Sequence, residues 1–289
     1  MSLPDELVDH ILSFLQSDLV TLKKCAEAHP ILSRISERYI YAKVALYDDF
    51  LTTVPVTPPG LRTTKFAQII AKTPNITNHI RDLEIYINDK GDPWQSKATA
   101  SHLKSIASML PAFSRMKTIA LRARISWHTL PEIFRQAFQH LIHVQCMKNV
   151  SIFHMSFFPL SMLNNCETLT LHNCKDVQYE KEPIDSEDRP YRALEHLSIQ
   201  HSNCETLEKI TSWVQMHSLR SLAVILDDEF KFRDLLPQLL SACSSTLINL
   251  DLDLRWYSGC TFPSSNSTLC RADQLYQLTL CSESLRGLE

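Results

Sequence analysis

Hydrophobic residues near the start of the chain recur at the spacing of a helix. On a helical wheel of about 100° per residue, six apolar side chains fall within one arc of roughly 160°: Leu7, Val8, Ile11, Leu12, Phe14 and Leu15. Polar residues occupy the rest of the wheel, so the pattern predicts a helix over 4–15. Ser17 and Asp18 then mark the start of a second helix, and His29-Pro30 ends it and begins a third. We therefore predict three short helices within residues 1–45.

These three helices carry more apolar surface than they can bury among themselves. Each large apolar side chain left in water costs roughly 1.5–3 kcal/mol, so part of this surface is expected to face a partner or the rest of the chain. Two interpretations follow. The helices are either a binding module or a cap that seals one end of the following domain.

The same residues resemble an F-box. The resemblance covers about residues 2–46 and rests on Leu3-Pro4-x-Glu6-Leu7-x-x-x-Ile11-Leu12-x-x-Leu15, followed by Asp18-Leu19-x-x-Leu22 and Cys25. The third helix has Leu32 where many F-boxes have Trp. The resemblance implies that this module docks on the Skp-family adaptor of a cullin-based ubiquitin ligase. The adaptor-binding residues carried over from the pattern are Leu3, Pro4, Leu7, Ile11, Leu15, Leu19 and Leu22.

A second pattern, apolar-x-x-apolar-x-apolar, recurs along the rest of the chain. It is found at 80–85, 116–121, 141–146, 166–171, 194–199, 219–224, 247–252 and 275–280. The fourth positions of these segments are separated by 36, 25, 25, 28, 25, 28 and 28 residues, and leucine-rich repeats have periods of about 20–29. Helical spacing is found between the segments, at 100–112, 130–139, 204–214 and 232–242.

Together these patterns predict an α/β fold with three parts. A three-helix F-box over 1–47 is followed by a polar connector over 48–65, which holds Pro55, Pro58, Pro59 and Gly60. Residues 66–289 resemble a leucine-rich-repeat solenoid of about eight irregular repeats. Such a solenoid has parallel strands on its concave face and helices outside.

The alternation of a strand predicts which side chains face outward. The fourth and sixth positions of each segment should face the core, and the third, fifth and seventh the concave surface. The candidate client-binding residues are Tyr86, Arg122, His143, Gln145, Thr170, His172, His196 and Ser198. The histidines would make the contact sensitive to pH near 6.5. The other interpretation is that these residues are solvated and the client contacts the loop 175–190, which has six acids against three bases; that loop is itself interpretable as simply solvated.

Composition excludes several classes of function. A net charge of −3 and a pI near 6.5 give no long-range attraction to nucleic acid or anionic lipid. The sequence has no apolar run of about 18 residues and no signal-peptide pattern, which predicts a protein of the cytoplasm or the nucleus, not of the membrane. The nine cysteines include no Cys-x-x-Cys, so we expect reduced thiols.

No catalytic or cofactor motif stands out. The phosphate-binding glycine loops are absent, as are the common hydrolase and zinc motifs. His140, His143 and Cys146 have tempting intervals, but residues three apart on a strand point to opposite faces. We therefore expect no metal, no cofactor and no enzymatic activity.

The function implied by the resemblance is that of a substrate-receptor subunit of an SCF-type ubiquitin ligase. Its partners would be the Skp-family adaptor, cullin through that adaptor, and an unidentified client protein. The alternative is a leucine-rich-repeat scaffold that mediates protein contacts without a role in ubiquitin ligation.

Overall fold

The computed structural model describes residues 3–47, 60–87, 93–145, 147–163, 166–178, 194–202, 204–213, 218–226, 235, 238–253 and 277–281. In these residues the chain is an α/β protein in which paired strands run parallel. The chain divides into two compact units. Unit 1 comprises Met1–Arg122 and Pro131–Gln145, and unit 2 comprises Ala123–Leu130 and Cys146–Glu289.

Three helices open unit 1, as predicted: α1 (Asp5–Ser13), α2 (Leu19–Ala28) and α3 (Pro30–Ile40). Asp18 caps α2, because its carboxylate accepts from the backbone N–H of Thr21 at 3.0 Å and from the Thr21 hydroxyl at 2.6 Å. These bonds favour the charged carboxylate and lower the pKa of Asp18. His29 caps α3 in the same way, since its Nδ1 accepts from the N–H of Ile31 at 3.2 Å.

The three helices share a small core of their own. Its buried members come from all three helices and are Val8, Leu12, Leu22, Ile35 and Ile40. Polar contacts join α1 to α3 at the edge of this core. The Tyr39 hydroxyl lies 3.2 Å from Asp9 Oδ1, and Arg34 forms an ion pair with Asp5. The position of α1 on α3 is therefore set by both apolar and polar contacts.

The strands of unit 1 are β1 (Lys43–Tyr47), β2 (Gly60–Arg62), β3 (Asp82–Ile87) and β4 (Thr118–Ala123), in the order β4-β3-β1-β2. The predicted connector 48–65 is therefore wrong at its end, where β2 pairs with β1 and α4 begins at Thr63. A three-residue strand stabilised by backbone pairing leaves no hydrophobic period in the sequence. Residues 48–59 lie outside the described residues.

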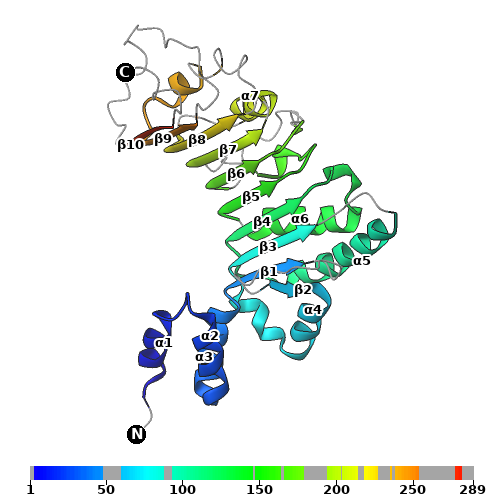
Figure 1. Ribbon diagram of the computed structural model, residues 1–289, viewed down its shortest axis with the longest axis vertical. Coiled ribbons are helices and arrows are strands. Elements are labelled where there is room, and N and C mark those ends of the chain that lie inside the picture. Colours follow the sequence, from blue (N-terminus) through cyan, green and yellow to red (C-terminus); the bar gives the residue numbers. More distant parts are fainter. Residues whose placement is uncertain are drawn as a thin grey trace, which may run out of the picture. The chain divides into compact units, whose positions relative to one another are not determined.

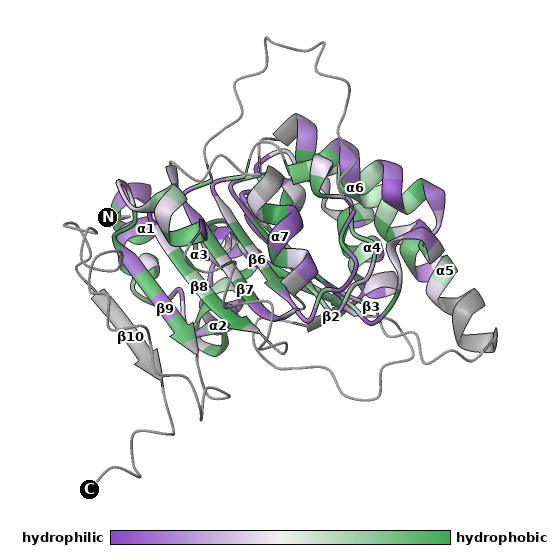
Figure 2. Cartoon of the chain, turned by 90° about the horizontal axis from the view of Figure 1, so that it is seen from above, coloured by the Kyte–Doolittle hydropathy of each residue, from purple (hydrophilic) through white to green (hydrophobic). Residues whose placement is uncertain are grey.

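Helices α4 (Thr63–Lys72), α5 (Pro93–Met109) and α6 (Glu132–Gln145) follow one another along one side of these strands (Figure 1). Short 3-10 helices, η1 (Pro74–His79) and η2 (Leu110–Ala112), lie in the connections. Both hydrophobic and hydrophilic residues colour α4 and α6 in Figure 2, as expected for helices with one buried side. The buried aromatic side chains of this layer are Phe66, Phe113, Phe134 and Phe138. No helix in the described part of the chain is long and apolar enough to cross a membrane.

Unit 2 contains β5 (Asn149–Phe153), β6 (Thr168–His172), β7 (His196–Ser202), β8 (Ser221–Leu226), β9 (Asn249–Asp253) and β10 (Gln277–Cys281). They pair in chain order, and their connections include η3 (Trp127–Thr129), η4 (Leu160–Leu163) and α7 (Cys204–Trp213). Leu169, Leu197, Leu222 and Leu250 stand opposite one another in successive strands. The sequence period thus becomes one continuous row of buried leucines.

Seven of the eight predicted strand segments contain a strand, and the predicted strand over 141–146 is wrong. Residues 141–145 are the last part of α6, and the strand lies a few residues later, at β5. The physical reason is the helical spacing of Phe134, Phe138, Leu141 and Ile142, all of which are buried. Met147-x-x-Val150-x-Ile152 matches the same strand pattern, and this second match is the one that pairs with β6.

The other predicted helical stretches are largely confirmed. Residues 100–112 lie in α5 and η2, 130–139 lie mainly in α6, and 204–213 form α7. Of the stretch 232–242, residues 235 and 238–242 are helical. The remaining residues of that stretch are outside the described ones.

Candidate functional site

One side of α1 carries a row of exposed hydrophobic side chains. Leu3, Leu7, Ile11 and Phe14 are 60, 50, 53 and 73 % exposed, respectively. Leu7 and Ile11 lie one turn apart on α1, and Leu3 and Phe14 flank the helix at similar intervals; we call these four residues the α1 stripe. Val8 and Leu12, on the adjoining part of the same apolar arc, are buried in the three-helix core. The apolar arc of α1 is thus divided into a covered and an uncovered half.

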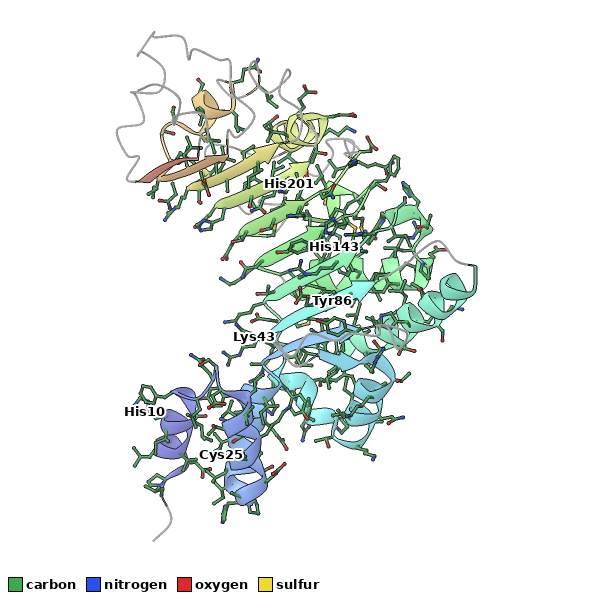
Figure 3. All side chains as sticks on the ribbon, viewed as in Figure 1. His10, Cys25, Lys43, Tyr86, His143 and His201 are labelled. Atoms are coloured by element: carbon green, nitrogen blue, oxygen red, sulfur yellow. The ribbon has the colours of Figure 1, made fainter. Side chains whose placement is uncertain are left out.

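The α1 stripe concentrates most of the exposed hydrophobic surface of the described residues. Of seven large hydrophobic side chains exposed there, five lie between positions 3 and 20; the fifth is Val20 on α2. The ring of His10 lies 5.0 Å from that of Phe14, and Figure 3 shows His10 projecting away from α2 and α3. Contiguous exposed apolar surface of this kind is typical of an interaction site.

The predicted adaptor-binding residues differ in how far they are buried. Leu3, Pro4, Leu7 and Ile11 are exposed. Leu15 and Leu19 are half-buried and pack against the three-helix core.

Leu22 is fully buried in that core, so it supports the module from within and offers no surface to a partner. Its place in the sequence pattern could not distinguish these two roles. Sequence reasoning missed Phe14 and Val20 as surface residues, although Phe14 was part of the apolar arc.

On β3 and β4 the predicted client-binding residues Tyr86 and Arg122 belong to one half-buried cluster. The Tyr86 ring stacks on that of Tyr47 with 4.3 Å between centroids, and the Arg122 guanidinium lies 5.6 Å from the Tyr86 centroid. Glu84 forms an ion pair with Arg122. Burial raises the pKa of Tyr86 and of Tyr47, so both phenols stay neutral at physiological pH. The cluster presents an aromatic surface with a compensated charge.

On β6 and β7 four predicted client-binding residues lie close together. Thr170 stands opposite Ser198 in the parallel register; His172 lies two residues after Thr170 on β6, and His196 two residues before Ser198 on β7. Along β6 the buried residues alternate with half-buried ones, and the four side chains are on the open face, where His196 is exposed. Thr170 and Ser198 are short and polar, so a partner's backbone can approach the face closely between the two histidines.

Sequence reasoning missed several neighbours of His172. Its ring lies 5.7 Å from Phe153, 5.1 Å from His154 and 5.3 Å from His201, measured between centroids. Phe153 and His154 escaped because the strand was expected at 141–146 instead of at β5. The second match of the strand pattern, starting at Met147, is the signal that would have found them.

Two predicted client-binding residues are wrong as strand residues. His143 and Gln145 lie on α6, and His143 Nδ1 is 3.0 Å from the carbonyl oxygen of Gln139 in the preceding turn. They are therefore not part of a strand face. The acidic loop proposed as the other contact is described only over 175–178, and its remaining residues lie outside the described ones.

Two observations concern the chemistry that the described residues could support. Among them, no three His, Cys, Asp or Glu side chains are placed to hold a metal ion. Burial raises the pKa of Cys166 to about 12, and the pKa of both Cys174 and Cys243 to about 11. These thiols are protonated at neutral pH and are poor nucleophiles.

Comparisons of the chain with family models, with curated proteins and with solved structures found no match. The function proposed below therefore rests on the α1 stripe and on the open face of the strands.

Proposed function

We propose that the chain is an F-box protein with a leucine-rich-repeat-like solenoid, acting as a substrate receptor of an SCF-type ubiquitin ligase. Helices α1–α3 bind a Skp-family adaptor and, through it, cullin. The open face of the strands binds a client protein. The protein itself catalyses no reaction.

The observation that carries this proposal is the exposed α1 stripe, which remains uncovered although helices α1–α3 already share a core of their own. The core accounts for Val8 and Leu12, but it leaves Leu7 and Ile11 at least half exposed. Covering a large apolar side chain completely stabilises by roughly 1.5–3 kcal/mol. The four residues of the stripe, each half or more exposed, thus offer a partner on the order of 3–6 kcal/mol. This surface is a candidate hydrophobic anchor, and the Leu-Pro-x-Glu-Leu motif directs it to an adaptor of the Skp family.

The strand face supports the receptor half of the proposal. Parallel strands with matched registers repeat the same alternation, with apolar side chains inward and polar ones on the open face. Repeat proteins commonly bind partners on such extended faces. A receptor of this kind acts by proximity: it raises the effective concentration of the client near the ubiquitin-conjugating enzyme. No side chain of the receptor needs to take part in the chemistry.

The adaptor contact is testable with a matched pair of variants. Ile11 on α1 and Ile133 on α6 are the same residue type with the same exposed fraction, 53 %. Ile11→Asp and the double variant Leu7→Asp with Ile11→Asp should lose capture of a recombinant Skp-family adaptor in a pull-down with the full chain. Ile133→Asp should capture it as the wild type does.

Two results would contradict the proposal. Capture of the adaptor by the double variant at wild-type levels would make the α1 stripe a structural surface only. The other result is a wild-type chain that is helical by circular dichroism and yet captures neither adaptor nor cullin. That result would favour the scaffold without a role in ubiquitin ligation.

A further inference from the structure

Three successive turns of unit 2 line a cavity that is open to solvent. The turns 124–126, 154–156 and 173–175 are joined by parallel bridges between Ser126 and Ser156 and between Ser156 and Lys175. Two of the turns begin directly after a strand with a residue of positive φ: His154 (φ 58°) follows β5, and Asn173 (φ 51°) follows β6. The cavity has a volume of about 570 Å³, within the range of about 300–1,000 Å³ that is typical of small-molecule sites.

The charged groups that line the cavity are all basic. Arg124 and Lys175 contribute one positive charge each, His154 contributes an imidazole, and none of the described lining residues is acidic. Arg124 and Lys175 are both exposed, and Asp176 follows Lys175 directly in the chain. On a chain of net charge −3, the described lining thus combines two basic side chains with an imidazole.

The remaining lining residues add hydrogen-bond donors and one apolar wall. The hydroxyls of Ser126 and Ser156 have no hydrogen-bond partner in the described part of the chain, and Nδ2 of Asn173 lies 3.1 Å from Nδ1 of His154. An amide that donates to Nδ1 keeps the neutral ring protonated on Nε2. Ile125 and Met155 are the apolar members of the lining.

We infer that this cavity binds a phosphate monoester of a small organic molecule. Arg and Lys beside two hydroxyls match the several acceptor oxygens of a phosphate group. The volume leaves room for the organic group that carries the phosphate, and the half-buried Ile125 provides an apolar surface for it. This site lies in unit 2 and does not depend on the adaptor contact of α1.

Titration calorimetry and phosphorus NMR on the full chain test this inference, with phenyl phosphate as the probe. Phenyl phosphate should bind, inorganic phosphate should bind more weakly because it leaves the apolar wall unused, and phenol should not bind. Arg124→Gln and Lys175→Gln should each weaken phenyl phosphate binding by about tenfold or more, as for a lost hydrogen bond to a charged group. Arg124→Lys with Lys175→Arg should retain most of the binding.

The matched control is Arg115→Gln with Lys104→Gln. Both residues are exposed in unit 1, so these substitutions remove the same amount of charge away from the cavity. This control should bind phenyl phosphate as the wild type does, at the same ionic strength. Equal weakening in the control and in Arg124→Gln with Lys175→Gln, with unchanged circular dichroism, would overturn the site. Inorganic phosphate that binds as tightly as phenyl phosphate would overturn the assignment to an organic ester.

Discussion

Neighbouring residues on α1 should respond in opposite ways to the same truncation. Leu12 is 2 % exposed and packs in the three-helix core, whereas Ile11 is 53 % exposed on the α1 stripe. Truncating a buried Leu to Ala costs about 2–5 kcal/mol, depending on how far the site can collapse. Because the partners of Leu12 include half-buried residues such as Leu15, the core can relax, and we expect a value near 2 kcal/mol for Leu12→Ala. Ile11→Ala should stay within about 0.5 kcal/mol of the wild type.

Hydrogen exchange by mass spectrometry resolves this difference, because the three-helix core can open without unfolding the sheet. A loss of about 2 kcal/mol corresponds to a roughly 30-fold rise in the open population. Peptides from α1–α3 should therefore exchange about 30-fold faster in Leu12→Ala and at the wild-type rate in Ile11→Ala. Equal acceleration in both variants would refute the division of α1 into a covered and an uncovered half.

Two further predictions concern ionisable groups. The thiols of Cys174 and Cys243, each with a pKa of about 11, should resist iodoacetamide at pH 7.5 in the native protein and react only after denaturation; native labelling of either one would contradict its burial. Burial, followed by the nearby charge of Arg38, lowers the pKa of His79 below its ordinary value of 6.5. The unfolded chain then binds the proton more readily, so stability should fall as pH drops below about 6.5. Urea midpoints at pH 7.5 and 5.5 should differ less in His79→Gln than in the wild type, and an unchanged difference would exclude this contribution.

The hydrophobic periods of the sequence correctly predicted the three N-terminal helices and most of the strands. The start and end signals around Asp18 and His29 depend on local hydrogen bonds, and the three helices follow from them. The repeated strand pattern predicted seven of its eight segments because each strand pairs with its sequence neighbour in the same register. Alternation along a strand is a local geometric property, which is why the open-face positions of Thr170 and Ser198 could be read directly.

Where the local sequence pattern allowed two structures equally well, only the tertiary structure decided between them. Residues 141–146 and 147–152 both match the strand pattern, and the choice depends on α6 continuing to Gln145 with Phe134 and Phe138 buried. The apolar arc of α1 contains Leu7 and Leu12 alike, and packing on α2 and α3 covers Leu12 alone. Hydrophobic periodicity reports that a face is apolar but not what lies against it. Burial is a property of the surrounding chain, so the uncovered half of α1 and the cavity between three turns became visible only in three dimensions.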